Sequence, residues 1–206
     1  MTTEHPPLLG DKHGKYRILI IGNSGTGKST LTTILSTKLN INSSNLDRLF
    51  WNPGWQETPT LEFKALVQET MDQNPEGWII DGNYTEKVGM MIQDQATDII
   101  WLDPPLVLYF PRIFMRTIKR WWGIQELCSP GCGETFKDIF LSRKSILAFC
   151  IEHHFVVRKR CREMMRNIGV GIGLDKERNC MRRIGGWGGA LKGWLRDVDD
   201  MVRKRP

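Results

Sequence analysis

Apolar and polar positions change their period along the chain, and the change predicts strands that are followed by helices. Residues 16–21 form a β-branched, apolar stretch that predicts a strand. A glycine-rich segment follows, with glycines at positions 22, 25 and 27. Beyond it, apolar residues recur at the spacing of one helical face, at Leu31, Ile34, Leu35 and Leu39. This part of the chain therefore predicts a strand, a glycine-rich loop and a helix in direct succession.

The middle of the chain continues this alternation. A short second strand is predicted within residues 42–48, and an amphipathic helix is predicted over residues 61–71. Two continuous apolar runs follow, at residues 78–80 and 99–102, and each ends in an aspartate. Such runs are typical of parallel strands that are buried on both faces. Strands that alternate with helices then predict an α/β domain with a parallel sheet flanked by helices.

The two ends of the chain differ from the middle. Beyond Pro111 the pattern is helical and basic, a break occupies residues 128–133, and helix resumes through Arg166. Residues 1–14 are polar and contain two prolines and two glycines, so we expect a flexible leader outside the fold. The chain has 206 residues, which suits a single domain over residues 15–206.

Composition excludes several classes of protein. With 40% hydrophobic and 25% charged residues, the chain does not resemble a disordered, collagen-like or coiled-coil protein. No apolar run reaches eighteen residues, so we expect no membrane span, and the polar start lacks the apolar core of a signal peptide. The odd number of five cysteines indicates free thiols rather than a disulfide framework. We therefore expect a cytoplasmic protein.

The charge is unevenly distributed. The net charge is +6, and the basic excess lies in the part of the chain after Asp103. A cationic half attracts nucleic acid, but it attracts the phosphate groups of a small ligand equally well. A third interpretation is a solvated helical face that carries Arg158, Lys159, Arg160, Arg162 and Arg166. Charge alone leaves these alternatives open.

The most specific signal is the segment between the first strand and the first helix. It matches the pattern G-x-x-x-x-G-K-[ST] in full, in the structural context that the pattern requires. Glycines allow backbone N–H groups to turn toward phosphates, and the helix that begins near Lys28 adds its positive end. We expect Lys28 to reach the β- and γ-phosphates of a bound polyphosphate and Ser29 to bind Mg²⁺. The predicted nucleotide-binding residues are Gly22, Asn23, Ser24, Gly25, Thr26, Gly27, Lys28, Ser29 and Thr30.

Three aspartates are candidates for further roles near the nucleotide. In parallel sheets, ligands bind beyond the carboxyl ends of the strands, and Asp81 and Asp103 each follow a predicted strand. Asp81 is our first choice for holding Mg²⁺, directly or through water. Asp103 is the second choice, with a helix cap or turn former as its alternative role. Asp47 is a candidate for facing a phosphoryl acceptor.

Several motifs together resemble one family of proteins. Taken in order, they are GNSGTGKST (22–30), LDRLFWNPGW (46–55), WIIDGNY (78–84), IWLDPP (100–105) and PGCGETF (130–136). This combination resembles adenylate-kinase-like P-loop proteins of the topology modulation protein type, over about residues 16 to 145. The resemblance implies a three-layer, nucleoside-kinase-like P-loop NTPase fold with a helical, lid-like insertion at about 112–145. It also implies ATP as phosphoryl donor and a small-molecule acceptor.

The resemblance implies roles for individual residues as well. Asp47 and Arg48 would look toward the acceptor pocket, and Asp81 would lie near Mg²⁺. Arg112 and Arg116, one helical turn apart, would clamp the transferred phosphoryl group. The chain also departs from the family, because Leu106, Gln125, Leu127 and Thr135 stand at positions that are usually charged, and Arg120, Arg143 and Arg158 are candidates for compensation.

These features predict an ATP-dependent small-molecule kinase with Lys28, Asp81, Arg112 and Arg116 as catalytic residues. Two alternatives stay open. One is an NTP hydrolase, with water as the acceptor, and the other is a regulatory, DNA-associated ATP-binding module that uses the basic half of the chain. Residues 181–187 (MRRIGGW) are interpreted either as a basic glycine loop near the nucleotide or as a surface turn.

Overall fold

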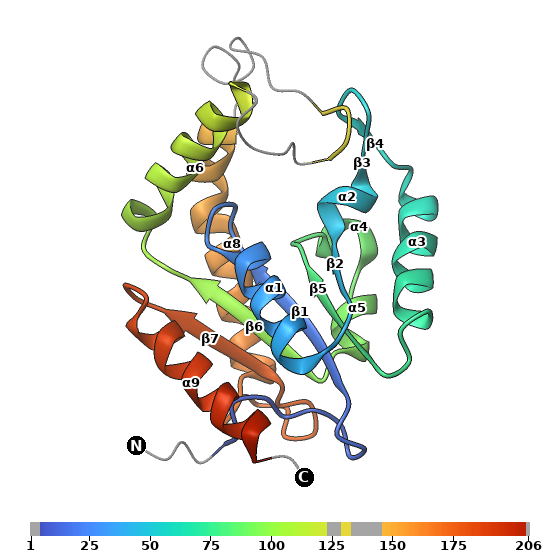
Figure 1. Ribbon diagram of the computed structural model, residues 1–206, viewed down its shortest axis with the longest axis vertical. Coiled ribbons are helices and arrows are strands. Elements are labelled where there is room, and N and C mark those ends of the chain that lie inside the picture. The colour runs from blue at the N-terminus through green and yellow to red at the C-terminus, as the bar shows by residue number, and fades with distance from the viewer. Residues whose placement is uncertain (1–4, 123–128, 133–145, 205–206) are drawn as a thin grey trace.

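A five-stranded sheet forms the centre of the molecule (Figure 1). The computed structural model describes residues 5–122, 129–132 and 146–204. The sheet order is β2-β5-β1-β6-β7, and every neighbouring pair of strands is parallel. The carboxyl ends of the strands therefore meet at one edge of the sheet. The strands are β1 (Tyr16–Gly22), β2 (Ser43–Asn45), β5 (Gly77–Asp81), β6 (Asp98–Asp103) and β7 (Met181–Gly185).

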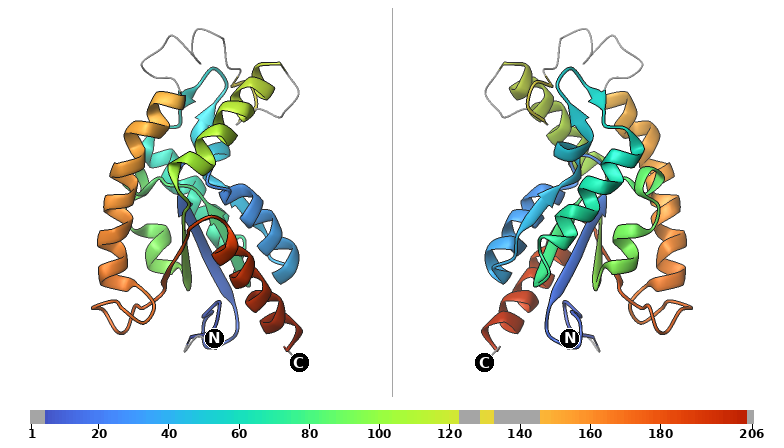
Figure 2. Two further views of the ribbon diagram at one scale, coloured as in Figure 1. Left: turned by 90° about the vertical axis from the view of Figure 1, so that its left-hand side faces the viewer. Right: turned by 90° about the vertical axis from the view of Figure 1, so that its right-hand side faces the viewer.

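Longer helices cover both faces of the sheet (Figure 2). They are α1 (Lys28–Leu39), α3 (Thr60–Asp72), α6 (Leu106–Trp121), α8 (Ile146–Ile168) and α9 (Gly189–Arg203). Three short helices lie between them: α2 (Leu46–Phe50), α4 (Thr85–Val88) and α5 (Met91–Gln95). A small antiparallel pair, β3 (Trp51–Asn52) and β4 (Gln56–Glu57), follows α2. The predicted α/β fold with a parallel sheet flanked by helices is confirmed.

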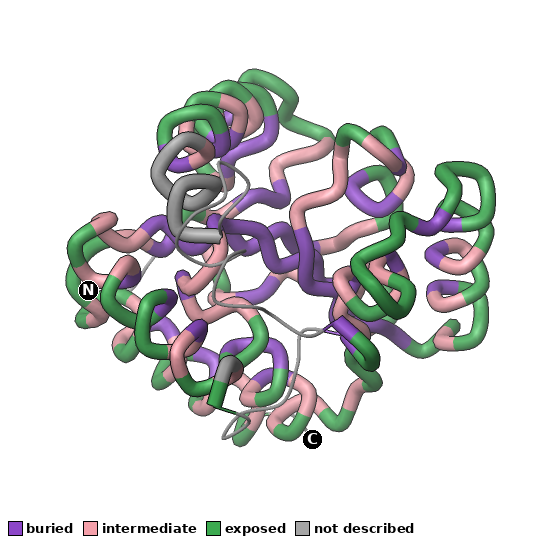
Figure 3. Tube along the Cα trace, turned by 90° about the horizontal axis from the view of Figure 1, so that it is seen from above, coloured by how far each residue is buried: buried purple, intermediate pink, exposed green. Residues whose placement is uncertain are grey.

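Two hydrophobic cores, one on each face of the sheet, explain why the central strands carry continuous apolar runs. Along β1, Ile18 and Ile20 belong to one core, with α1 and α9, while Leu19 and Ile21 belong to the other, with α3 and α8. Successive side chains of a strand point to opposite faces, so both faces of a doubly covered sheet require apolar residues. Figure 3 shows the buried segments gathered in the middle and the exposed ones around them.

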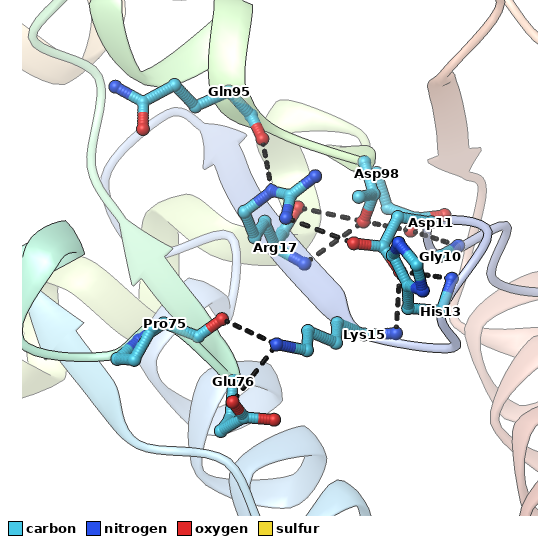
Figure 4. Close-up of polar contacts among 10 residues, drawn as sticks. Gly10, Asp11, His13, Lys15, Arg17, Pro75, Glu76, Gln95 and Asp98 are labelled. Carbon is cyan, nitrogen blue, oxygen red and sulfur yellow. Dashed lines mark hydrogen bonds and ion pairs between the residues drawn. The ribbon is translucent and has the colours of Figure 1, made fainter.

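The segment before β1 corrects one prediction from the sequence. Residues 1–14 were predicted to be a leader outside the fold, but Leu8 is only 1% exposed and joins the core between the sheet, α1 and α9. The backbone N–H group of Leu9 donates to the Asp98 carboxylate at 2.7 Å. The backbone N–H group of Gly10 donates to the same carboxylate at 3.0 Å (Figure 4). The packed apolar side chain and these hydrogen bonds make this part of the segment a component of the fold.

The region after β6 differs from the prediction in two ways. Helix α6 begins at Leu106, before Pro111, whereas the sequence predicted helix only beyond Pro111. Residues 181–185, which were expected to be a loop or turn, form the edge strand β7 beside β6. Most of the lid-like insertion expected at about 112–145 lies outside the described residues. Among the helices that the structure describes, none is long and apolar enough to cross a membrane.

Candidate functional site

The glycine-rich loop between β1 and α1 lies at the carboxyl edge of the sheet and fits tightly against its surroundings. Gly22 has a φ of 148°, and a Cβ atom there would lie 2.6 Å from the backbone oxygen of Leu102 in β6. A Cβ atom on Gly25 (φ 75°) would lie 2.4 Å from Cγ1 of Ile113 in α6. Only glycine fits such positions, because both the backbone conformation and the space exclude a side chain.

Lys28 folds back over this loop. Its Nζ atom donates to the backbone oxygen of Asn23 at 3.2 Å, and the Thr26 hydroxyl donates to the same oxygen at 2.8 Å. Helix α1 begins at Lys28, with no acidic residue in its first turn and no side-chain cap at Gly27. A helix N-terminus of this kind, beside a lysine, favours an anionic ligand.

A buried carboxylate lies beside the start of α1. Asp81 ends β5, is 1% exposed, and accepts a hydrogen bond from the Thr32 hydroxyl at 3.1 Å. Burial raises the pKa of Asp81, and the nearby Lys28 ammonium and Ser29 hydroxyl oppose that rise. The Ser29 hydroxyl also accepts a hydrogen bond from the Asn45 side chain at 3.4 Å. A desolvated carboxylate beside a serine hydroxyl is the kind of oxygen-donor set that suits Mg²⁺.

Helix α6 contributes an arginine to the loop. Nη2 of Arg116 donates to the Ser24 hydroxyl at 2.8 Å, so this guanidinium reaches the loop itself. Arg112 lies one turn earlier in α6 and is exposed to solvent. The structure therefore brings Arg116 to the glycine-rich loop, whereas it gives Arg112 no contact of this kind with the loop.

The two residues expected at an acceptor pocket lie in α2, directly after β2. Asp47 is half-buried, and one of its carboxylate oxygens accepts a hydrogen bond from the Tyr84 hydroxyl at 2.7 Å. Arg48 is exposed. Tyr84 is in turn held by ring contacts with Phe50 and Phe63, at centroid distances of 4.7 and 5.3 Å. Although Tyr84 belongs to the motif at residues 78–84, sequence reasoning gave it no role.

Asp103 has a different environment from Asp81, although both end buried strands. Asp103 is 4% exposed and forms ion pairs with two arginines: Arg158 of α8, Nε to Oδ1 at 2.9 Å, and Arg183 of β7, Nη2 to Oδ2 at 2.7 Å. Two guanidinium groups thus engage this carboxylate, so its role as second choice for Mg²⁺ receives no support. Arg158, considered as a compensating arginine, is directed at Asp103.

The basic stretch of α8 is divided between internal and external contacts. Arg158 pairs with Asp103, and Arg160 pairs with Glu86 at 2.8 Å. Lys159, Arg162 and Arg166 are exposed. The interpretation of this basic stretch as a solvated helical face therefore holds for the three exposed residues and not for the two paired arginines.

Comparison with known proteins identifies solved structures that share the fold of this chain. No family model matches the chain, and no curated protein matches it. The chain is similar to the unliganded crystal structure of a sugar kinase from Janibacter sp. HTCC2649, with a TM-score of 0.50, 12% identity and coverage of 92% of this chain and 93% of that one. The chain therefore shares the α/β fold of this sugar kinase.

Two further solved structures are similar to the chain. A gluconokinase from Sinorhizobium meliloti 1021 has 13% identity and a TM-score of 0.49, with 92% of each chain covered. A shikimate kinase from Bacteroides thetaiotaomicron has 14% identity and a TM-score of 0.43, with 91% of this chain and 96% of that one covered. The segment 22–29, which matches the P-loop pattern and is hereafter called the P-loop, is in contact with α6 and with the end of β6.

Proposed function

We propose that the protein is an ATP-dependent small-molecule kinase that transfers the γ-phosphoryl group of ATP, with Mg²⁺, to a small acceptor. One observation carries the proposal: Lys28, Asp81 and Arg116 converge from three different elements on the P-loop. A kinase needs this arrangement because phosphoryl transfer depends on positioning and on charge stabilisation. The motif combination supports the narrower class of adenylate-kinase-like proteins of the topology modulation type.

Each residue has a role that follows from its place. The P-loop amides and Lys28 would hold the phosphates, and Ser29 and Asp81 would hold the metal ion, which supplies positive charge to the phosphates. Arg116, which already touches the loop, would stabilise charge on the transferred group, and Arg112 would join it from the same helix. Asp47 would accept the proton of the acceptor hydroxyl, with Tyr84 fixing its orientation.

Nucleotide binding is the first test. We expect Lys28→Ala to abolish detectable MgATP binding in calorimetry while the thermal unfolding midpoint changes little, because Lys28 is not part of either hydrophobic core. Lys12→Ala is the matched control, since Lys12 is exposed and lies before β1, at the other end of that strand. Equal MgATP affinity in wild type and Lys28→Ala would contradict the assignment of the loop.

Phosphoryl transfer is the second test. Wild type is incubated with γ-labelled ATP, Mg²⁺ and a panel of nucleoside monophosphates, sugars and hydroxy acids, and the labelled products are separated. We expect one class of acceptor to be labelled, and Asp47→Asn to bind MgATP normally but to lose at least about 100-fold in transfer rate. Release of labelled phosphate with every acceptor left unlabelled would favour the hydrolase instead.

A second candidate function, an ATP-binding module associated with DNA, rests on a different observation. Lys159, Arg162 and Arg166 are exposed in α8 at a spacing that places them on one helical face. Duplex binding that weakens steeply with salt would favour this candidate. If the protein shows no affinity for duplex DNA at low salt, the candidate fails.

A further inference from the structure

A line of polar side chains connects the P-loop with α6 and α8. The amide Nδ2 of Asn23 donates to the hydroxyl of Tyr109 in α6 at 3.0 Å, and that hydroxyl lies 2.7 Å from Nδ1 of His154 in α8. On the other side of the ring, Nε2 of His154 lies 3.4 Å from Nη1 of Arg158, which pairs with Asp103. Asn23, Tyr109 and His154 are all buried, at 8%, 1% and 5% exposure.

The chemistry of the Arg158 partner indicates which ring nitrogen of His154 carries the proton. A guanidinium group can only donate, so Nε2 of His154 must be the accepting nitrogen. The ring proton of neutral His154 is then on Nδ1, and Nδ1–H donates to the Tyr109 oxygen. The same oxygen accepts the hydrogen bond from Asn23. The opposite tautomer would place an N–H group against the Arg158 donor.

Asn23 forms several of the hydrogen bonds within the P-loop, so the line of polar side chains bears on the position of the whole loop. Its backbone oxygen accepts hydrogen bonds from the Lys28 ammonium at 3.2 Å and from the Thr26 hydroxyl at 2.8 Å. Its side-chain oxygen accepts the N–H of Ser24 at 2.9 Å. Whatever holds the Asn23 side chain therefore also holds the oxygen over which Lys28 is folded.

We propose that His154 is a positioning residue for the P-loop: as its Nδ1–H tautomer it holds Tyr109, and through Tyr109 it holds Asn23 and Lys28 in place for the nucleotide. This inference rests on the proposed nucleotide-binding function. It adds to that function a residue from α8, far from the P-loop in sequence and outside every motif. The line also joins the P-loop to the two helices on either side of the predicted lid.

Protonation of His154 would break this arrangement. The charged groups that face the ring are Arg158 and Arg162 of α8 and Asp103 of β6, and Tyr109 faces it from α6. Burial lowers the pKa of His154, and the positive charge of Arg158 lowers it further, against a smaller opposite effect of Asp103. A proton on Nε2 would remove the acceptor and place like charges together. Because the pKa of His154 is lowered, nucleotide affinity should fall only in acid more strongly acidic than about pH 6.5, the pH near which an unperturbed histidine ionises.

Three variants test the proposal through MgATP affinity. His154→Leu removes the hydrogen bonds of the ring with Tyr109 and Arg158, and Tyr109→Phe removes those of the hydroxyl with Asn23 and His154. We expect each variant to weaken MgATP binding at pH 7.5 by about tenfold. His154→Asn places an amide near the position of Nδ1, so that the donor to Tyr109 can be kept, and we expect it to restore most of the affinity. His13→Leu, at an exposed site before β1, is the matched control and should bind as wild type does.

The pH profile separates positioning from simple packing. Because ATP itself titrates in this range, the profile of wild type is compared with that of His154→Asn. We expect wild type to lose more affinity than His154→Asn as the pH is lowered from 7.5 to the lowest pH at which both proteins stay folded. Parallel profiles for the two proteins would overturn the proposal, and so would wild-type affinity in both His154→Leu and Tyr109→Phe.

A spectroscopic measurement keeps the test independent of nucleotide. Nitrogen-15 chemical shifts of the His154 ring in unliganded wild type should report the neutral Nδ1–H tautomer at pH 7, and the Nε2–H tautomer or an imidazolium would overturn the proposal. Failure of wild type to bind MgATP would instead refute the proposed function. The tautomer result then still decides whether His154 holds Tyr109 as described. If His154→Leu does not fold, Tyr109→Phe and the ring shifts carry the test.

Discussion

At the scale of single residues, Asp81 combines an unfavourable environment with the position that the proposed chemistry needs. It is almost fully buried, and its contact with Thr32 does not prevent its pKa from being raised by desolvation. Because the pKa of Asp81 is higher in the folded protein than in the unfolded chain, ionised Asp81 destabilises the fold once the pH exceeds its pKa in the unfolded chain. Functional residues at ligand sites often lower the stability of the folded protein in this way.

Replacing Asp81 by Asn should stabilise the protein and impair its activity. We expect the free energy of unfolding of Asp81→Asn to rise by about 1 kcal/mol at pH 7, because a buried charge is removed. The gain should vanish near about pH 3, where Asp81 is protonated in both states. Mg²⁺-dependent phosphoryl transfer should fall by at least about 100-fold. Urea denaturation and initial rates measure the two effects.

A matched control for this variant is Asp72→Asn, at an exposed position in α3. It should change the free energy of unfolding by less than about 0.5 kcal/mol and leave activity unaltered. Loss of stability in Asp81→Asn at pH 7 would show that the ionised carboxylate stabilises the fold after all.

The glycines of the P-loop are not equivalent. An added Cβ atom at Gly25 would meet Ile113 of α6, whereas at Gly27 nothing lies within 4 Å, although both have positive φ. We expect Gly25→Ala to lower the free energy of unfolding of the unliganded protein by about 1–3 kcal/mol more than Gly27→Ala does. Chemical denaturation of both variants measures the difference. Equal losses would mean that backbone strain alone, and not contact with α6, requires glycine here.

At the scale of elements, the sequence predicts those parts whose pattern is local. The strand, loop and helix over residues 16–39 follow from apolar alternation and from a motif with its own geometry, and the structure confirms them. Strand β7 was missed because its five residues include Arg182 and Arg183. It is an edge strand of the sheet, beside β6, and its arginines have distant partners, the oxygen of Pro6 and the carboxylate of Asp103.

The attachment of β7 and α8 to β6 should depend on Asp103. We expect Asp103→Asn to lower the free energy of unfolding by about 1–3 kcal/mol, because two arginines lose a buried partner. Asp94→Asn is the comparison, since Asp94 is 54% exposed in its ion pair with Arg178 and should change stability by less than about 1 kcal/mol. Urea unfolding measures both variants, and similar losses in the two would contradict the special role of Asp103.

At the scale of the whole molecule, the N-terminal segment and the candidate site show which long-range contacts could not be predicted from the sequence. Leu8 lies among prolines and glycines that suggest a loose leader, yet its side chain packs in a hydrophobic core. The backbone that follows it donates hydrogen bonds to the buried Asp98 carboxylate. In the site, Lys28 and Asp81 could be predicted because motifs mark them. Tyr109 and His154 could not, since their contact joins positions 45 residues apart.

Removing the Leu8 side chain should reveal this packing. We expect Leu8→Ala to lower the free energy of unfolding by about 2–4 kcal/mol, as for other fully buried leucines. Lys12→Ala, exposed and only four residues away, should have little effect. Denaturant titrations of the two variants measure the difference. If Leu8→Ala lowers the free energy of unfolding by less than about 0.5 kcal/mol, the segment behaves as a leader outside the fold.

The parallel order of the sheet has a practical consequence for handling the protein. The two ends of the described chain lie together at the lower end of the molecule, where β1 begins, while the P-loop follows the other end of that strand (Figures 1 and 2). An affinity tag, a fluorophore or a tether to a sensor chip, attached near either of these ends, would be joined at the end of the molecule opposite the P-loop. Immobilised protein should therefore present its candidate site to ligands in solution.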